Sequence, residues 1–307
     1  MSEQLQSQSV QTTGHAWDGD LQEFNNPLPT WWVYTFYITV AFALVYWFLY
    51  PSWPIGKSFL GGFSTISYVN KAGETQTSHW NTRALLMEKL NEAEKMQKPY
   101  FSKIASMSFQ QISHDQELSG FVQSAGRALF TDNCAPCHQQ GGQGLVGAYP
   151  NLTDDDWLYG GNYESIQETI TNGRRGYMPT FSEVLNAQQI DALANYVASL
   201  SGIGHDVAKA GEGEQLFHSE TAACYYCHGP DGKGKQTIGA PNLTDKIWLW
   251  ANVPAAENDA AKLAAIRQII YSGQSKGVMP VWGERLAPEQ IKVLTVYVHD
   301  VLGGGSK

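Results

Sequence analysis

The strongest constraint on the fold of this chain is an internal duplication that begins near residue 120. The first copy holds, in order, GRALF (126–130), CAPCH (134–138), YPNLTDDDW (149–157) and NGRRGYMP (172–179). The second holds GEQLF (213–217), CYYCH (224–228), APNLTDKIW (240–248) and SGQSKGVMP (272–280). Two copies in one fixed order indicate a duplicated module, because a solenoid needs at least three repeats.

Each copy ends in a segment with helical periodicity. The first follows Asn186, a residue type that caps helix N-termini, and the second has Pro288 in its first turn. The apolar stripes are Ile190, Leu193, Ala194, Val197 and Leu200, and Ile291, Leu294 and Val298. Neither copy shows strand-like alternation. We therefore expect an all-α fold with two tandem domains, 120–203 and 204–307, in which about ten extra residues around 253–259 form a surface loop.

The two pentapeptides indicate the chemistry. Cys-x-x-Cys-His is the signature of covalent haem attachment. Two thiols three residues apart lie on one helical turn, where each can add to a haem vinyl group, and the next residue presents its imidazole to the iron. The motif predicts two c-type haems. Their attachment and ligand residues are Cys134, Cys137 and His138, and Cys224, Cys227 and His228.

Three other interpretations of these segments fit less well. A zinc site made of four thiolates conflicts with the 93 residues that separate Cys134 from Cys227 and leaves the histidines unexplained. A thioredoxin-like pair needs a βαβ pattern, which neither copy has. The segment 229–235, GPDGKGK, matches the start of a phosphate-binding loop, but Gln236 stands where Ser or Thr should bind Mg²⁺ and no strand precedes it.

Two methionines are candidates for the sixth iron ligand. After residue 138 the chain contains only Met178 and Met279, one in each copy and each followed by proline. A thioether ligand favours reduced iron and raises the potential. We expect six-coordinate iron with the pairs His138–Met178 and His228–Met279. Two ordinary core methionines are the alternative.

The residues around each haem follow from the spacing. A carbonyl at or near Pro150 and Pro241, twelve and thirteen residues after the histidines, would accept the second imidazole N–H. Arg174 and Arg175 would pair with haem propionates or face solvent. The candidates for aromatic walls, each equally a core position, are Trp157, Tyr177, Phe181, Trp248 and Trp282.

A second constraint lies at residues 31–50, WWVYTFYITVAFALVYWFLY, which contain no charge, Gly or Pro. Twenty residues at ~1.5 Å rise span the ~30 Å hydrocarbon layer of a bilayer, and Trp and Tyr cluster at both ends as at membrane interfaces. The alternative is a buried helix of a soluble domain. We expect a single transmembrane helix, preceded by a segment at 1–30 and followed by a connector at 51–119 that holds an amphipathic helix at 81–97.

Two signals for the orientation disagree. Lys57 and Lys71 follow the helix and no Lys or Arg precedes it, so the positive-inside rule would put the domains in the cytoplasm. Haem is attached to this motif outside the cytoplasm, and this chemical requirement outweighs a bias. We expect the haem domains and the connector in the periplasm, residues 1–30 in the cytoplasm and the helix in a bacterial inner membrane.

The charge distribution bears on partners. The net charge of −9 argues against nucleic acid. Residues 120–203 carry eight acids and three bases, which either dock a basic partner protein or form a solvated surface.

Each copy resembles a class I cytochrome c, a family in which the first and last helices cross at a glycine–aromatic contact. The residues that carry this resemblance are Gly126, Leu129 and Phe130 with Tyr196, and Gly213, Leu216 and Phe217 with Tyr297. The N-terminal residues TTGH (12–15), DG (18–19), NNPLP (25–29) and WW (31–32) are similar to the lead of the dihaem subunit, III or P, of cbb3-type cytochrome c oxidase. The resemblance covers nearly the whole chain. We expect the chain to lack the extra N-terminal helix of some members.

The resemblance implies a subunit of a proteobacterial terminal oxidase in the respiratory chain. Soluble cytochrome c or the bc1 complex would donate electrons, which would pass toward the monohaem subunit and then the haem–copper subunit that reduces oxygen. Two six-coordinate irons leave no open position, so the chain itself would do no bond chemistry. The rivals are a dihaem peroxidase, which needs an open iron, and a free-standing membrane shuttle, which would purify without a copper-containing partner.

Overall fold

The computed structural model describes residues 11–275 and 277–304, and the chain divides into two compact units, Met1–Met96 and Gln97–Lys307. Residues 1–10 of the expected N-terminal segment, Lys276 and residues 305–307 of the second expected domain lie outside the described residues.

Helix α1, Thr30–Leu49, dominates the first unit and lies within one residue of the expected membrane segment. It is the one helix in the described part of the chain that is long and apolar enough to cross a membrane. None of its residues is buried within the unit. A core helix of a soluble domain would bury at least one face, so the exposure of α1 all round favours the membrane interpretation.

Three short antiparallel hairpins accompany α1. Strand β1 (Thr12–Trp17) pairs with β2 (Leu21–Phe24), β3 (Pro54–Ile55) with β4 (Ser58–Phe59), and β5 (Thr65–Val69) with β6 (Thr75–His79). The main elements are helical, as predicted, but these hairpins were not expected. The turn between β5 and β6 depends on Asn70, whose side-chain oxygen accepts from the N–H groups of Ala72 and Glu74 at 2.9 and 3.0 Å. Such local turn chemistry escapes a search for long periodic runs.

Helix α2, Thr82–Ser106, includes most of the expected amphipathic helix but runs beyond it through Pro99. Its last turns belong to the second unit, where Ile104 is fully buried and Tyr100 stacks on Phe121 with ring centroids 4.7 Å apart. Tertiary packing therefore extends this helix past its predicted end.

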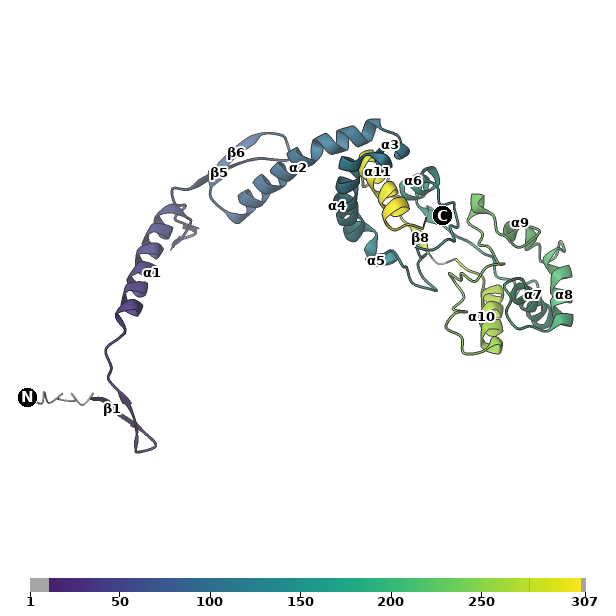
Figure 1. Cartoon of the computed structure of the whole chain (residues 1–307), viewed down its shortest axis with the longest axis horizontal. Coiled ribbons are helices and arrows are strands. Elements are labelled where there is room, and N and C mark those ends of the chain that lie inside the picture. The colour runs from purple at the N-terminus through teal and green to yellow at the C-terminus, as the bar shows by residue number, and fades with distance from the viewer. Residues whose placement is uncertain (1–10, 276, 305–307) are drawn as a thin grey trace, which may run out of the picture. The chain divides into compact units, whose positions relative to one another are not determined.

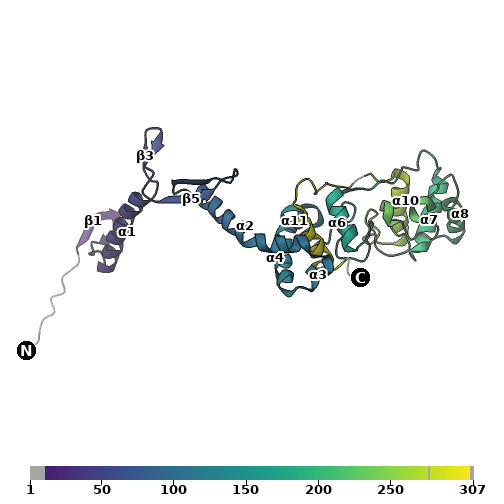
Figure 2. The same ribbon diagram turned by 90° about the horizontal axis from the view of Figure 1, so that it is seen from above.

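The second unit is mainly helical (Figures 1 and 2). It contains two hydrophobic cores. After α2 its elements are α3 (Phe109–His114), α4 (Gln116–Asn133), α5 (Ala135–His138), α6 (Tyr163–Asn172), β7 (Arg174–Arg175), α7 (Ala187–Leu200), α8 (Val207–Phe217), α9 (Tyr225–His228), η1 (Gln236–Ile238), α10 (Asp259–Ser272), β8 (Val278–Met279), α11 (Pro288–Val296) and η2 (Tyr297–Val301). The last element is a π-helical continuation of α11.

The two cores differ in how the chain builds them. Core A joins the end of α2 with α3, α4 and α6, and is completed by α11 and η2 from the far end of the chain. Core B uses only residues between Met178 and Ile270, including α7, α8 and α10. Figure 1 shows α11 beside α4, and α7 beside α8 and α10. The expected division at residues 203 and 204 therefore does not coincide with the division between the cores.

The contacts between helices show directly that the two repeats exchange their last helices. A Cβ atom on Gly126 would lie 2.7 Å from Cβ of Tyr297, and one on Gly213 would lie 2.8 Å from Cβ of Tyr196. Only glycine permits these close approaches. The expected glycine–aromatic contacts thus occur twice, but the expected partners are wrong, because each glycine meets the tyrosine of the other copy.

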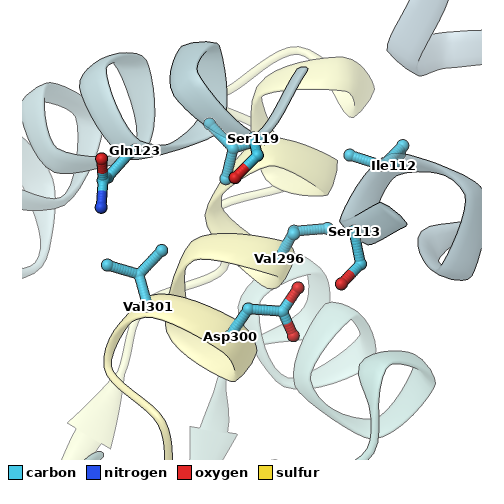
Figure 3. Close-up of a pocket in the computed structure, with 8 residues that line it drawn as sticks. Ile112, Ser113, Ser119, Gln123, Val296, Asp300 and Val301 are labelled. Atoms are coloured by element: carbon cyan, nitrogen blue, oxygen red, sulfur yellow. The ribbon is translucent and has the colours of Figure 1, made fainter. Parts of the chain in front are cut away.

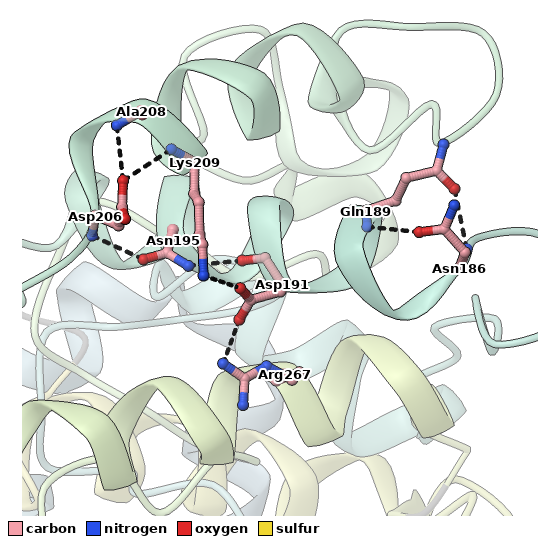
Figure 4. Close-up of polar contacts among 8 residues, drawn as sticks. All are labelled: Asn186, Gln189, Asp191, Asn195, Asp206, Ala208, Lys209 and Arg267. Atoms are coloured by element: carbon pink, nitrogen blue, oxygen red, sulfur yellow. Dashed lines mark hydrogen bonds and ion pairs between the residues drawn. The ribbon is translucent and has the colours of Figure 1, made fainter.

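A short connection explains the exchange. Residues 201–206 join α7 to α8, so the last helix of the first copy and the first helix of the second pack as a hairpin. Polar contacts fasten it (Figure 4). The N–H of Asp206 donates to Oδ1 of the buried Asn195 at 2.9 Å. Asp191 pairs with Lys209 of α8 at 2.8 Å and with Arg267 of α10. Helix α11 is then left to close core A.

Two local expectations in core B have different outcomes. The predicted N-cap is confirmed, because the side-chain oxygen of Asn186 accepts from the N–H of Gln189 at 3.0 Å (Figure 4). The extra residues around 253–259 are not simply a surface loop, since Val253 is only 4% exposed and belongs to core B.

Candidate haem sites

Both Cys-x-x-Cys-His segments form a single helical turn. In the first, the N–H groups of Cys137 and His138 donate to the carbonyl of Cys134 at 3.1 and 2.9 Å. In the second, Cys227 and His228 donate to Cys224 at 3.2 and 2.9 Å. The two thiols of each motif therefore lie one turn apart at the end of α4 or shortly after α8, as attachment to one flat ring requires.

A proline carbonyl orients each histidine. The Nδ1 atom of His138 lies 3.0 Å from the carbonyl oxygen of Pro150, and Nδ1 of His228 lies 3.1 Å from that of Pro241. In this geometry Nδ1–H donates and the lone pair is on Nε2. Burial lowers the pKa of both histidines, against a smaller opposing effect of the carbonyl bond. The lowered pKa favours a neutral ring, the carbonyl bond leaves Nε2 free to bind iron, and the predicted proline carbonyls are confirmed.

The loop after each histidine repeats the same backbone bonds. The N–H of Gly144 donates to the carbonyl of His138 at 2.9 Å, and that of Gly234 donates to His228 at 2.7 Å. The segment 229–235 thus has the same role as its counterpart in the first copy. It contains no helix and follows no strand, so its resemblance to a phosphate-binding loop is not accompanied by the matching structure.

The chain crosses between the cores at the two Met-Pro segments. Strands β7 and β8 pair antiparallel, with Arg174 opposite Met279. Beside them, the N–H of Met178 donates to the carbonyl of Gln274 at 2.7 Å, and the N–H of Gln274 donates back at 2.8 Å. Neither Gln274 nor this ladder was predicted, since its strands are only two residues long.

Beyond the crossing, each Met-Pro segment follows a helix of the other copy. The N–H of Phe181 donates to the carbonyl of Ile270 in α10 at 3.2 Å, and the N–H of Trp282 donates to Ile170 in α6 at 3.2 Å. A Cβ atom on Gly173 would lie 2.4 Å from the carbonyl oxygen of Met279, so the crossing requires glycine there.

The methionines therefore lie in the opposite cores from those expected. Met279 packs against core A, as do Cys134 and Trp157, whereas Met178 packs against core B, as do Cys224 and Trp248. The pairs His138–Met178 and His228–Met279, inferred from order along the chain, are not the pairs that these cores bring together. The cores favour His138 with Met279 and His228 with Met178.

The arrangement of the thiols does not fit a single zinc site. Cys134 contacts core A and Cys224 contacts core B, so the four thiols do not gather at one point. Among the described residues, no group of three or more His, Cys, Asp or Glu side chains is arranged to hold a metal ion. Burial raises the pKa of Cys134 to about 12 and that of Cys224 to about 11. Neutral thiols in an apolar wall suit thioether bonds better than a thiolate cluster.

The other expected haem neighbours divide into two groups. Trp157 and Trp282 pack against core A, and Phe181 and Trp248 against core B. Tyr177 is 75% exposed and walls neither core.

The expectation that Arg174 and Arg175 pair with haem propionates stays a prediction, although Arg174 already has partners. Its Nε donates to Thr169 at 3.0 Å, its Nη1 lies 3.1 Å from Glu168, and its guanidinium stacks on Tyr159.

A group of carboxylates was not predicted from the sequence. Burial raises the pKa of Asp156 to about 6, and the negative charges of Asp245 and Asp154 raise it further. The pKa values of Asp154 and Asp245 are also raised, mainly by burial. Both loops carry the sequence NLTD, and their recurrence was the signal available for finding this group.

A pocket of about 320 Å³ lies away from the predicted ligands, among α3, α4 and η2 (Figure 3). Its polar lining comes from Ser113, Ser119, Gln123 and Asp300. Asp300 is already engaged, because the hydroxyl of Tyr163 donates to it at 2.7 Å and Nδ1 of His299 lies 2.5 Å away. We assign no ligand to this pocket.

Two helical cores, each with a Cys-x-x-Cys-His turn, a carbonyl-tied histidine and a half-buried methionine, define a cytochrome c, and α1 makes it a membrane-anchored one. Residues 122–197 and 208–298 match the family described as cytochrome C oxidase, cbb3-type, subunit III. Residues 9–57 match the N-terminal domain of cytochrome oxidase-cbb3, FixP. The chain belongs to the family of subunit III of cbb3-type cytochrome c oxidase, and this membership implies binding of haem c.

Curated relatives align along almost their whole length. The chain is 42% identical over 303 residues to the cbb3-type cytochrome c oxidase subunit FixP of Azorhizobium caulinodans, an alignment that covers 96% of this chain and 93% of that protein. It is 38% identical over 305 residues to subunit CcoP of Cereibacter sphaeroides, with 96% and 95% covered.

Proposed function

We propose that this chain, a membrane-anchored electron-transfer subunit of a cbb3-type oxidase, carries two haem c groups and relays electrons one at a time toward the oxygen-reducing subunit. The observation that supports this proposal is that each core holds one Cys-x-x-Cys-His turn, one histidine bound to a proline carbonyl and one partly buried methionine. When bound, the haem iron supplies one-electron redox chemistry.

The protein's own contribution is to hold the ligands. Cys134 and Cys137, and Cys224 and Cys227, would bind the two rings covalently. The carbonyls of Pro150 and Pro241 hold His138 and His228 in the tautomer with a free Nε2. A methionine in the same core would supply the second protein ligand, and a thioether ligand would favour the reduced state and leave no open position for substrate. This last point separates the relay from a dihaem peroxidase, which would show a high-spin haem.

The axial pairs in this proposal are His138 with Met279 and His228 with Met178. Two chains that each keep one attachment motif would test them: Cys224→Ser/Cys227→Ser, which retains the first haem, and Cys134→Ser/Cys137→Ser, which retains the second. Met279→Ala should lower the midpoint potential by ~0.1 V or more only in the chain with the first haem, and Met178→Ala only in the other.

The opposite pattern in those four redox titrations would restore the contiguous pairing. Equal effects of both methionines on each haem would show that they act through the fold alone. Haem content and the thermal midpoint of each variant serve as controls for misfolding.

The proposed location puts the haem cores and the connector 51–119 on the periplasmic side of an inner membrane and residues 1–30 in the cytoplasm. The chemistry of haem attachment supports this location. The positive-inside rule, applied to the lysines after α1, predicts the opposite orientation. Fusions of a periplasm-dependent reporter enzyme after residue 119 should be active, and fusions before residue 30 inactive. The reverse pattern would contradict the orientation.

The proposed partners are the monohaem and haem–copper subunits of the oxidase, with soluble cytochrome c or the bc1 complex as electron donor. Purification in a gentle detergent should recover this chain with copper and b-type haem. Recovery of the chain alone would favour a free-standing membrane shuttle.

A further inference from the structure

A hairpin directly after α1 presents large apolar side chains that the first unit leaves about half exposed. Strands β3 and β4 pair around a two-residue turn at Gly56 and Lys57, and the ladder continues where the N–H of Leu60 donates to the carbonyl of Trp53 at 2.9 Å. We call residues 53–60 the juxtamembrane hairpin. Its large apolar side chains are exposed by 46–62%: Trp53, Ile55, Phe59 and Leu60.

Both faces of this hairpin are apolar. Residues opposite each other in an antiparallel pair lie on the same face, and successive residues alternate. Pro54 is opposite Phe59, whereas Ile55 is opposite Ser58, so Phe59 and Ile55 point to opposite faces. A hairpin that packed on a protein surface would need only one apolar face. Apolar side chains on both faces indicate an apolar environment that surrounds it.

Hydrogen bonds to α1 set the depth of this region. The N–H of Phe63 donates to the carbonyl of Phe48 at 3.2 Å, and the N–H of Ser64 donates to that of Leu49 at 2.7 Å. These bonds satisfy carbonyls in the last turn of the helix, which have no partner inside it. Phe63 also stacks on Phe48, with ring centroids 4.5 Å apart. Because α1 has just the length of the hydrocarbon layer, its C-terminal end and the hairpin lie at the membrane interface.

We propose that the juxtamembrane hairpin inserts into the bilayer interface beside α1, with lipid as its partner. Trp53, whose ring lies 4.9 Å from that of Trp47, is the residue type enriched at this depth. At the tip, Lys57 has no carboxylate partner among the described residues and is placed to reach lipid phosphates while its stem stays among the apolar groups. The proposal rests on α1 crossing the membrane.

The test uses the full holoprotein in the purified oxidase, reconstituted into nanodiscs. Single cysteines are introduced as Phe59→Cys in the hairpin, Ile38→Cys in α1 and Gln76→Cys in β6, and each is labelled with the fluorophore NBD. Quenching by doxyl-labelled lipid is compared with quenching by aqueous iodide. The lipid-to-iodide ratio at position 59 should be several-fold higher than at position 76 and close to that at position 38.

Other outcomes would overturn the proposal in distinguishable ways. A ratio at position 59 like that at position 76 would place the hairpin in water. Protection from both quenchers would place it against another subunit. A low ratio at position 38 as well would remove the transmembrane assignment itself. Lys57→Glu in the Phe59→Cys chain should lower the ratio, since lipid phosphates repel a carboxylate, and an unchanged ratio would refute the role of Lys57.

Discussion

Core A and core B arise from the same repeated sequence, but the chain closes them differently. Core B is complete within residues 178–270, whereas core A needs α4 near the start of the second unit and α11 at its end. In effect, core B is inserted into the chain of core A. Equivalent repeats therefore need not be equivalent folding units, and core A needs residues from both ends of the second unit.

One helix position shows how each core is fastened. Asp191 in α7 and Lys292 in α11 occupy equivalent positions of the two repeats, because each directly follows a Gln-Ile dipeptide. Asp191 binds cations on α8 and α10, inside its own core. The Nζ of Lys292 instead donates to the carbonyls of Ala105 and Met107 at the end of α2. The ion pairs of Asp191 thus connect helices within core B. The hydrogen bonds of Lys292 instead connect α11 to the end of α2.

The largest effect is expected from deletion of residues 278–307. Core A would lose α11 and Met279, while core B keeps α7, α8 and Met178. We expect the haem at His138 to be lost or high-spin and the haem at His228 to keep its methionine, as measured by the methionine-to-iron charge-transfer absorption of the ferric protein. If the second haem lost its methionine instead, each haem would take its methionine from its own repeat. The proposed difference between core A and core B would then be wrong.

A smaller loss of stability is expected from Lys292→Met. The substitution keeps the apolar stem but removes the donor to two carbonyls at the end of α2, at a cost of about 1–3 kcal/mol. Thermal denaturation followed at the haem of core A should show a lower midpoint, with core B unaffected. Lys262→Met, which removes a half-buried lysine paired with Asp259 in α10, serves as the matched control. Equal shifts in the two variants would contradict the proposed fastening.

In core B, Asp191→Asn should cost about 1 kcal/mol, because the ion pairs are partly exposed. The hydrogen bond from Lys209 lowers the pKa of Asp191, and Arg267 lowers it further. A lowered carboxyl pKa stabilises the fold above the unfolded value of ~3.9 and loses this effect as the pH falls through the folded value. The difference in thermal midpoint between wild type and variant should therefore shrink toward pH 3. A difference that does not change with pH would point to packing instead of charge.

The smallest effect concerns Asp156, whose pKa is raised to about 6. The folded state then binds this proton more tightly than the unfolded state, so stability falls as the pH rises from ~4 toward 6. Asp156→Asn should remove a penalty of about 1 kcal/mol at pH 8, after allowance for solvent screening, and little at pH 4. Asp155→Asn controls for the loss of one negative charge in the same loop. A benefit that is equal at both pH values would rule out the titration.

Much of each candidate site could be predicted because it depends on local chemistry. The Cys-x-x-Cys-His turns and the proline carbonyls follow from residues at most thirteen positions apart. The cap at Asn186 is equally local. The cores in which Met178 and Met279 lie were not predicted, because both repeats carry compatible surfaces and order along the chain does not say which helix pairs form. The NLTD carboxylates were missed because their pKa values depend on burial.

The sequence by itself indicated the membrane helix, the duplication, the attachment motifs and the eight candidate ligand residues, since each is a matter of composition or short spacing. Only the tertiary structure decided which methionine lies in which core. The six residues between α7 and α8 keep those helices together. Once Tyr196 packs on Gly213, the only equivalent surface left for Gly126 is that of Tyr297, at the other end of the repeat.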